Sequence, residues 1–315
     1  MEEKFQYETA FSRNLGWVTP VEQAKLRHCR VAVGGLGGVG GSHAITLARL
    51  GIGHFTITDL DTFDWPNLNR QAGAFASTMG ESKIEVLAKV LRDINPEVQI
   101  KLMPIGLDAS NIDEFLDGAA LYMDSLDIFA LEIRRAVFGR CKTLGIPAVT
   151  AAPMGMGTAF LAFTAQSMSF EDYFAFSSSD SFEDKIVKFI VGVSPSMQQR
   201  HYLVERGGVN LFEKKVPSTA IGIELAAGVA CANGLKLILG RGDTMVAPYG
   251  LHFDAYRNRL IKTWRPFGNR NPLQRLMFMY VRRLLRPRQD RQVPPGVASP
   301  HPESNTARLP IKSDS

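Results

Sequence analysis

The chain has 315 residues and a net charge of +5, and 45% of its residues are hydrophobic. That length can bury one large core, or a main domain with an appendage, and the composition is ordinary for a globular protein. No uninterrupted apolar run is long enough to span a bilayer, and the polar, acidic N-terminus is unlike a secretory signal. We therefore expect a cytoplasmic protein without a transmembrane segment.

Residues 1–29 form a predicted N-terminal leader. A helix is expected from Pro20 to Arg27, because proline at a first helical turn after a Thr cap is a common start signal. Arg13 lies upstream of this helix. On the residues alone, a solvated leader arginine is the better interpretation of Arg13.

The stretch from Arg30 to Gln71 predicts a strand, a tight loop, a helix and a second strand. Val31 to Val33 is an apolar β-branched run, the chain is apolar again from His43 to Leu50, and a strand is expected over His54–Thr58. The loop between them matches G-x-G-x-x-G, a pattern that lets the chain turn, admits a phosphate to the backbone and brings helix and strand into contact. Its glycines are Gly35, Gly37, Gly38 and Gly40.

Asp59 follows the second strand, about where an acidic residue meets a ribose hydroxyl in dinucleotide-binding folds. By itself this unit favours a dinucleotide oxidoreductase. The next residues favour a different ligand, because a nicotinamide ring needs an apolar slot, whereas this loop is polar and is followed by Lys83. Cations beyond a glycine-rich loop suit a triphosphate and the charge that develops when it is attacked. The polar residues of the loop are Asp59, Asp61, Asn67, Asn69, Arg70 and Gln71.

The combination G-x-G-G-x-G, D-x-D, N-L-N-R-Q and G-x-x-K resembles the enzymes that activate ubiquitin-like proteins, including their bacterial ThiF/MoeB/HesA relatives. The resemblance implies that residues 30–265 form a ThiF-type adenylation domain that uses ATP and Mg²⁺. It implies a homodimer in which Arg13 reaches the nucleotide of the neighbouring subunit. It also assigns Asp127 to magnesium, through the second Asp of a D-x-x-D turn.

The remaining elements alternate between helices and strands, which predicts a Rossmann-like, doubly wound, mostly parallel sheet. The resemblance implies that an antiparallel C-terminal extension continues this sheet. Asp124 and Asp127 follow a central strand, so they are expected at the ligand crevice, although N-capping of the next helix is an alternative for both. Arg134 and Arg135 are candidates for the family's downstream arginine. The expected elements are a helix over 81–94, a strand over 98–105, a short helix over 111–116, a strand ending at 124, a helix over 128–141, a strand within 142–150 and an antiparallel strand after it.

Residues 166–215 are expected to be a variable crossover. Family members that transfer the activated group to sulfur carry a cysteine near this region, and the chain has none between Cys141 and Cys231. The only other cysteine is Cys29, so the spacings predict neither a disulfide framework nor a zinc site. Cys231 lies in an apolar stretch rich in small residues, where a buried, inert thiol is expected. That stretch is predicted to be a core helix rather than a membrane span, and a strand containing Phe253 and Asp254 follows it.

Residues 266–286 predict a basic amphipathic helix that docks on its own domain by default. A partner or an anionic membrane surface is the alternative. The tail, 287–315, is rich in Pro, Ser and Arg and is expected to be disordered. Its basic character favours non-specific attraction to phosphate but not a dedicated DNA-binding module. The predicted apolar face of the helix comprises Leu273, Leu276, Met277, Tyr280 and Leu284.

The resulting hypothesis is an adenylyltransferase in which Arg70, Lys83 and a partner's Arg13 stabilise charge while a carboxylate attacks ATP. Asn67 and Gln71 would orient phosphate or loop, with turn-forming hydrogen bonds as the alternative for Asn67. The carboxylate would belong to the C-terminus of a ubiquitin-like protein or peptide. The alternatives are a tRNA threonylcarbamoyladenosine dehydratase-like enzyme, a non-catalytic partner of an active homologue, and an NAD-dependent oxidoreductase.

Overall fold

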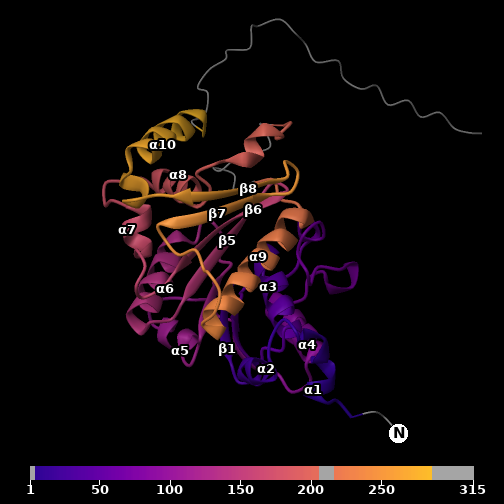
Figure 1. The fold of residues 1–315 in the computed structure, drawn as a ribbon. Coiled ribbons are helices and arrows are strands. Elements are labelled where there is room, and N and C mark those ends of the chain that lie inside the picture. The colour runs from indigo at the N-terminus through magenta and orange to yellow at the C-terminus, as the bar shows by residue number, and fades with distance from the viewer. Residues whose placement is uncertain (1–3, 206–215, 286–315) are drawn as a thin grey trace, which may run out of the picture. The chain divides into compact units, whose positions relative to one another are not determined.

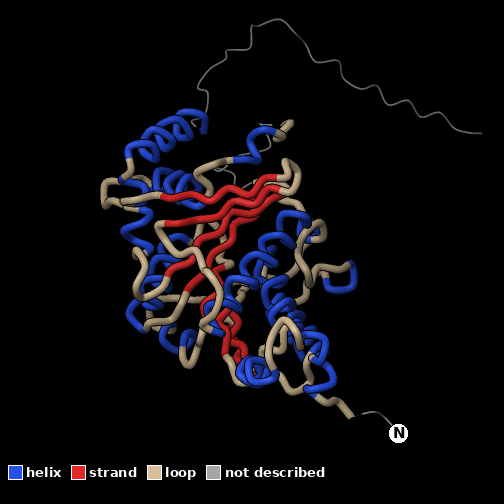
Figure 2. The backbone as a smooth tube through the Cα atoms, viewed as in Figure 1, coloured by secondary structure: helices blue, strands red, loops and turns tan. Residues whose placement is uncertain are grey.

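One eight-stranded sheet organises the computed structural model, which describes residues 4–205 and 216–285. The predicted tail over 287–315 and residues 206–215 of the predicted crossover lie outside the described residues. The strand order is β3-β2-β1-β4-β5-β6-β7-β8 (Figures 1 and 2). The strands are β1 (Arg30–Gly34), β2 (His54–Thr58), β3 (Gln99–Met103), β4 (Leu121–Asp124), β5 (Ala148–Met154), β6 (Gly157–Phe163), β7 (Tyr249–Asp254) and β8 (Arg259–Trp264).

The first five strands pair in parallel, and the pairings from β5 to β8 are antiparallel. The predicted mostly parallel sheet with an antiparallel C-terminal extension is therefore confirmed. Because β1 lies between β2 and β4, the carboxyl ends of these three strands meet at one edge of the sheet. Open α/β sheets bind their ligands at that edge.

Helices cover both faces of the sheet and create two cores. Alternation along β1 sends Val31 and Val33 to one core and Ala32 to the other. The first core packs the sheet against α3, α4 and α9, and the second packs it against α5 to α8 (Figure 1). The α-helices are α1 (Tyr7–Ala10), α2 (Pro20–Arg27), α3 (Gly38–Arg49), α4 (Lys83–Ile94), α5 (Ile112–Leu116), α6 (Leu131–Leu144), α7 (Phe170–Phe174), α8 (Phe182–Val193), α9 (Ala220–Leu239) and α10 (Pro272–Leu285).

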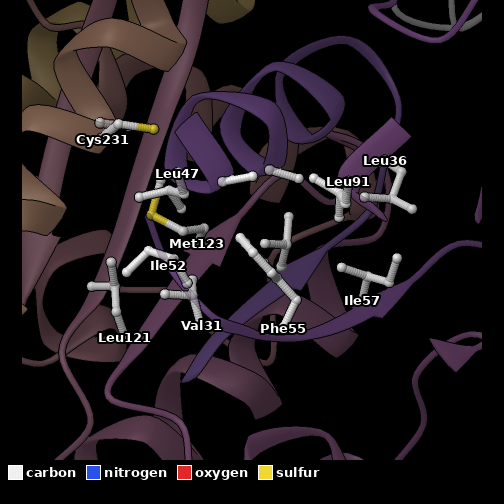
Figure 3. Close-up of a cluster of buried hydrophobic side chains, with 14 of the residues drawn as sticks. Val31, Leu36, Leu47, Ile52, Phe55, Ile57, Leu91, Leu121, Met123 and Cys231 are labelled. Atoms are coloured by element: carbon white, nitrogen blue, oxygen red, sulfur yellow. The ribbon is translucent and has the colours of Figure 1, made fainter. Parts of the chain in front are cut away.

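Helix α9 is long and apolar enough to cross a membrane, but half of its apolar window is buried inside the protein. It packs against α3, β5 and β6. Figure 3 shows the Cys231 thiol of α9 near Leu47 and Met123 in the first core. Burial raises the pKa of the Cys231 thiol, so the expected buried, inert cysteine is confirmed.

Two predicted elements differ in the structure because tertiary contacts override the local pattern. The helix after the glycine-rich loop begins at Gly38 rather than at His43. Glycines in its first turn allow the helix backbone to pack directly on the loop, where a side chain would not fit. The predicted single strand around Phe253 is a hairpin of β7 and β8. Asn258 makes the turn with φ +52°, a conformation that Asn tolerates better than most residues.

Helix α10 docks on its own domain, as expected by default, and Met277 of the predicted apolar face packs against the cluster of Val187, Val191 and Val281, but the rest of the docking face differs. Val281 and Gln274 are buried against α8, where the Gln274 side-chain amide donates to the Val191 carbonyl (3.1 Å). The predicted apolar face was wrong for Leu273, Leu276 and Tyr280, which are 69%, 59% and 52% exposed, and the side chain of Leu284 lies outside the described residues. Packing against α8 instead buries an adjacent face of α10 that contains Gln274 and Val281.

Candidate functional site

The glycine-rich loop connects β1 to α3 at the carboxyl edge of the sheet. Gly35 has φ +87°, and a Cβ there would lie 2.6 Å from the Ser125 carbonyl oxygen. A Cβ on Gly40 would lie only 1.8 Å from the carbonyl oxygen of Gly35. These positions therefore need glycine, one for the turn and one for the contact between helix and loop.

The other two glycines face the ligand side and helix α9. A Cβ on Gly37 would find only the Gln71 amide nitrogen nearby, at 3.8 Å, so its backbone is open to approach. A Cβ on Gly38 would lie 2.8 Å from Ile223 Cδ1, which gives this glycine a packing reason. No side chain caps the N-terminus of α3 among the described residues. Its free N–H groups and the helix dipole form a site that favours an anion.

Asp59 ties the end of β2 to the glycine-rich loop. One carboxylate oxygen accepts from the Leu36 backbone N–H (2.6 Å), and the other accepts from that of Asp61 (2.9 Å). Each carboxylate oxygen has a second lone pair, so a ribose hydroxyl can still donate to Asp59. The side chain lies at the predicted place, and its contact with ribose stays a prediction.

Lys83 is the first residue of α4, and its side chain turns to the polar loop. Its ammonium group lies 2.9 Å from a carboxylate oxygen of Asp61. The Lys83 side chain is only 7% exposed, whereas that of Asp61 is 61% exposed. A nearly buried cation held by one exposed carboxylate can exchange that partner for a phosphate oxygen, because both are anions in the same charge-assisted contact.

Arg70 and the asparagines beside it fold the polar loop onto itself. The Arg70 guanidinium donates to the Pro66 carbonyl (2.8 Å) and to the Asn69 side-chain oxygen (2.9 Å). The Asn67 side-chain oxygen accepts from the Asp64 N–H (3.0 Å), which is the turn-forming role considered for it. Asn69 donates to the Ser218 carbonyl (3.0 Å) and so connects the loop to the start of α9.

Gln71 lies beside the glycine-rich loop, with its Nε2 3.8 Å from the place of a Cβ on Gly37, and it carries an unsatisfied acceptor. Its side chain is buried, and its Oε1 has no hydrogen-bond partner among the described residues. A buried acceptor without a donor costs about 1–3 kcal/mol. A hydroxyl or amine of a bound nucleotide would supply that donor, so the residues present fit a nucleotide at this loop.

Asp124 and Asp127 do different work in the loop after β4. Asp124 is buried and forms an ion pair with Arg134 (2.8 Å), which also donates to the Asp127 backbone carbonyl (3.2 Å). Asp127 is exposed, and its Oδ1 accepts from the Phe129 N–H (2.8 Å). Asp124 is therefore structural, while Asp127 keeps an exposed carboxylate in the loop after β4, and its contact with a metal stays a prediction. Arg135 instead pairs with Glu132 and Glu171.

Within residues 4–205 and 216–285, no group of three or more His, Cys, Asp or Glu side chains is arranged to hold a metal. Magnesium is commonly bound through one or two carboxylates together with substrate phosphates. The chemistry of the single carboxylate of Asp127 therefore fits a magnesium ion that ATP phosphates would complete.

Arg13 lies far along α3 from the loop of its own chain. It sits in a short 3₁₀-helix (Ser12–Asn14), where Asn14 donates to the carbonyl of Arg49, the last residue of α3 (3.3 Å). The Arg13 side chain is exposed and has no ion-pair or hydrogen-bond partner in the described part of the chain. A helix of this length spans about 18 Å. The structure thus brings Arg70, Lys83, Asp59 and Gln71 to one edge and leaves Arg13 out.

His43 and Ser125 join the site without having been predicted. His43 Nδ1 lies 2.9 Å from the Ser125 hydroxyl, and a Cβ on Gly40 would lie 2.9 Å from Ser125 Cβ. Burial lowers the pKa of His43 to about 3, so its ring is neutral at pH 7. The pair fixes the loop after β4 against the glycine-rich loop. No sequence motif joins two residues 82 positions apart, so only the fold reveals them.

Comparison with known proteins extends the geometric description. The family model described as "ThiF family" matches residues 11–276. The chain is 32% identical over 145 residues to a tRNA threonylcarbamoyladenosine dehydratase of Haemophilus influenzae, covering 46% of this chain and 55% of that protein. It is also 32% identical over 142 residues to a molybdopterin-synthase adenylyltransferase of Salmonella typhimurium, covering 45% and 56%. The chain thus spans about half the length of these curated relatives.

Among solved structures, a crystal structure of E. coli MccB matches with a TM-score of 0.64 and 18% identity. The match covers 86% of this chain and 75% of MccB. At that identity the likeness concerns the fold alone.

Proposed function

The chain belongs to the ThiF family, as its motifs predicted, and from that premise we propose that it is an ATP-dependent adenylyltransferase. The proposed reaction converts a substrate carboxylate to an acyl-adenylate and releases pyrophosphate. One observation carries the proposal. Lys83, at the start of α4, pairs with Asp61 of the polar loop that carries Arg70, and Asp59 of the same loop is bonded to the glycine-rich loop before the uncapped N-terminus of α3. Gln71 leaves a buried acceptor unpaired there.

In the proposed reaction, a carboxylate oxygen attacks the α-phosphorus of ATP. The bond from that phosphorus to the oxygen bridging the α- and β-phosphates breaks, and pyrophosphate leaves with the electron pair. Negative charge grows on the phosphate oxygens, and Lys83 and Arg70 would stabilise it. The glycine-rich loop and the N-terminus of α3 would hold the phosphates, and Asp59 and Gln71 would position the nucleoside. Asp127 would hold magnesium, which supplies further neutralisation of the phosphate charge.

We further propose a homodimer in which Arg13 acts in trans. Arg13 lies at the far end of α3 from its own loop and has no partner in the described residues, so its charge is available to another subunit. The test mixes an Arg13→Ala chain with a Lys83→Ala chain, each inactive alone. Mixed dimers would contain one site with both residues and should regain up to about a quarter of the wild-type rate on random pairing. Absence of any recovery, with dimers verified by light scattering, would contradict the trans arrangement.

The proposed substrate is the C-terminal carboxylate of a small ubiquitin-like protein or peptide, in the cytoplasm. A tRNA threonylcarbamoyladenosine side chain is the second candidate, favoured by the 32% identity to the Haemophilus influenzae dehydratase. ATP–pyrophosphate exchange that depends on an added peptide would support the first. ATP consumption that depends on tRNA carrying the modified adenosine would support the second and overturn the first.

A non-catalytic partner and an NAD-dependent oxidoreductase fit the site less well. A scaffold needs no nearly buried lysine beside an anion site, and a nicotinamide ring would meet Lys83 and Arg70 rather than an apolar slot. Lys83→Ala and Asp127→Ala chains that kept the cellular function would favour the scaffold. Tighter binding of NAD than of ATP in calorimetry would favour the oxidoreductase.

A further inference from the structure

A basic, aromatic surface lies beside the turn between β5 and β6, outside the residues considered so far. We call it the Tyr–Arg patch and define it as Arg200, His201, Tyr256, Arg257 and Arg259. The Tyr256 side chain is 61% exposed, and its ring packs on that of Tyr202 with a centroid distance of 4.5 Å. Partial desolvation, and then the guanidinium groups of Arg257, Arg200 and Arg259, lower the pKa of His201. The three guanidinium groups therefore all lie close enough to His201 to act on it.

Tyr202 mounts the patch rigidly on the β5–β6 turn. Its hydroxyl accepts from the Met156 N–H (2.8 Å) and donates to a carboxylate oxygen of Asp254 (2.9 Å). A Cβ on Gly155 would lie 2.6 Å from that hydroxyl. Asp254 is fully buried and also accepts from the Arg257 backbone N–H (2.9 Å). Its carboxylate is therefore hydrogen-bonded within the protein and is not exposed to a ligand.

The same turn touches the first turn of α9, which touches the glycine-rich loop. The Gly155 carbonyl accepts from the Thr219 hydroxyl (2.8 Å), and a Cβ on Gly222 would lie 2.5 Å from that carbonyl oxygen. Ile223, the next residue, packs on Gly38. Direct contacts thus run from the glycine-rich loop through the start of α9 and the β5–β6 turn to Tyr202 and Tyr256, which connects the patch to the proposed site.

Two of the arginines have their charges available. Arg259 is exposed and has no side-chain partner in the described part of the chain. Among the same residues, the Arg200 guanidinium has one hydrogen-bond partner, the neutral ring nitrogen Nε2 of His201 (3.5 Å). Arg257 donates to the Gln198 side-chain oxygen (2.7 Å), a neutral partner that leaves its charge uncompensated. Three guanidinium groups beside an exposed aromatic ring recognise an anionic chain.

The position of Arg259 favours a peptide over a nucleic acid. Arg259 begins β8, which is the last strand of the sheet and pairs only with β7 among the described strands. An edge strand offers N–H and C=O groups to an extended peptide, which a nucleic acid cannot use in the same way.

We propose that the Tyr–Arg patch binds an acidic segment of the peptide or protein whose C-terminal carboxylate is activated. The proposal rests on the proposed adenylation of such a carboxylate. Acidic side chains of the substrate pair with Arg200, Arg257 and Arg259, and an apolar or aromatic side chain packs on Tyr256. The segment approaches along the start of β8, and its C-terminus continues past the β5–β6 turn toward the glycine-rich loop.

Fluorescence anisotropy of the full chain without ATP tests the patch separately from the chemistry. The probes are three labelled decamers: one of Glu and Gly, one of Lys and Gly, and a single-stranded RNA. Arg200→Glu and Arg259→Glu alter exposed side chains and preserve the Gln198 contact of Arg257. Arg283→Glu on α10 is the matched control, because it reverses the same charge at another exposed position. ATP binding by calorimetry should be equal in all variants.

The acidic decamer should bind, and the Lys decamer should not. Each patch variant should weaken binding of the acidic decamer about tenfold and the double variant more, since each reversal removes an exposed ion pair and adds repulsion. Arg283→Glu should change the affinity less than twofold. If both patch variants bound the acidic decamer with the wild-type affinity, the proposal would be overturned. Tighter RNA binding that both variants abolish would also overturn it and reassign the patch to nucleic acid.

Discussion

Lys83 and Asp61 form an ion pair of 2.9 Å in which the lysine is nearly buried and the aspartate is largely exposed. This asymmetry separates the two roles. The start of α4 fixes the position of the Lys83 ammonium group. Water can replace Lys83 as the partner of the exposed Asp61 carboxylate. A phosphate arriving at the loop therefore meets a positioned ammonium whose partner can move away at little cost.

Lys83→Ala should lower the rate of adenylation by about 10²–10³, because it removes a positioned charge that acts on the transition state. The measurement is ATP–pyrophosphate exchange with a saturating carboxylate substrate. Lys89→Ala, an exposed position on the same helix, should stay within twofold of wild type. Equal rates for the two variants would remove Lys83 from the catalytic groups.

Gly40→Ala should destabilise the fold by more than 3 kcal/mol, since its Cβ would lie 1.8 Å from the Gly35 carbonyl oxygen and the backbone must shift. Gly139→Ala on α6 is the control, because a Cβ there meets nothing within 4 Å. Removing a helical glycine should stabilise that variant by about 0.5–1 kcal/mol. Urea unfolding of both variants checks the contrast, and similar unfolding midpoints would contradict the close contact.

Arg134→Ala should cost about 3–5 kcal/mol of stability, because it leaves the buried Asp124 carboxylate unpaired. Arg135→Ala removes ion pairs with Glu132 and Glu171, both on partly exposed side chains, and should cost about 1 kcal/mol or less. The measurement is the free energy of unfolding in urea at pH 7. If the two substitutions cost the same, Asp124 and Arg134 do not form the buried pair described.

His43 should make the protein less stable in acid. Burial lowers its pKa in the folded state to about 3, below the ordinary value of 6.5, so the unfolded chain binds the extra proton between these values. The contribution of His43 to the free energy of unfolding should therefore be fully present above about pH 6.5. It should fall as the pH drops toward 3, by at most about 1.4 kcal/mol per pH unit.

The comparison is between wild type and His43→Asn, with unfolding free energies measured at pH 4.5 and 7. Part of the wild-type loss comes from other groups, including His252, whose pKa is also lowered by burial. The variant should lose less stability over this range than the wild type. Identical losses would mean that His43 does not stay neutral in the folded protein.

Local patterns predicted the elements with strong local signals. Thr19 and Glu22 form the reciprocal cap that starts α2 at Pro20, and the glycine spacing located Gly35 and Gly40 where the backbone needs them. The mostly parallel sheet followed from the alternation of helices and strands. The ThiF resemblance was confirmed by the family match over residues 11–276.

Contacts between distant segments could not be predicted in the same way. On the residues alone, Asp124 and Asp127 had the same two interpretations, a place at the ligand crevice or a helix cap, and only the resemblance singled out Asp127. The burial of Asp124 beside Arg134 is seen in the fold alone. The face that α10 buries depends on α8, a partner that periodicity does not identify. Asn69 reaches the carbonyl of Ser218, 149 residues away, so its bridging contact follows from the fold alone.

The most direct test is a crystal structure of the chain with magnesium and a non-hydrolysable ATP analogue. We predict that the phosphates lie against Gly37 and the N-terminus of α3, that Lys83 leaves Asp61 for a phosphate oxygen, and that Gln71 Oε1 gains a donor from the nucleoside. A nucleotide bound elsewhere, with Lys83 still on Asp61 and Gln71 Oε1 still unpaired, would contradict the proposed adenylation site.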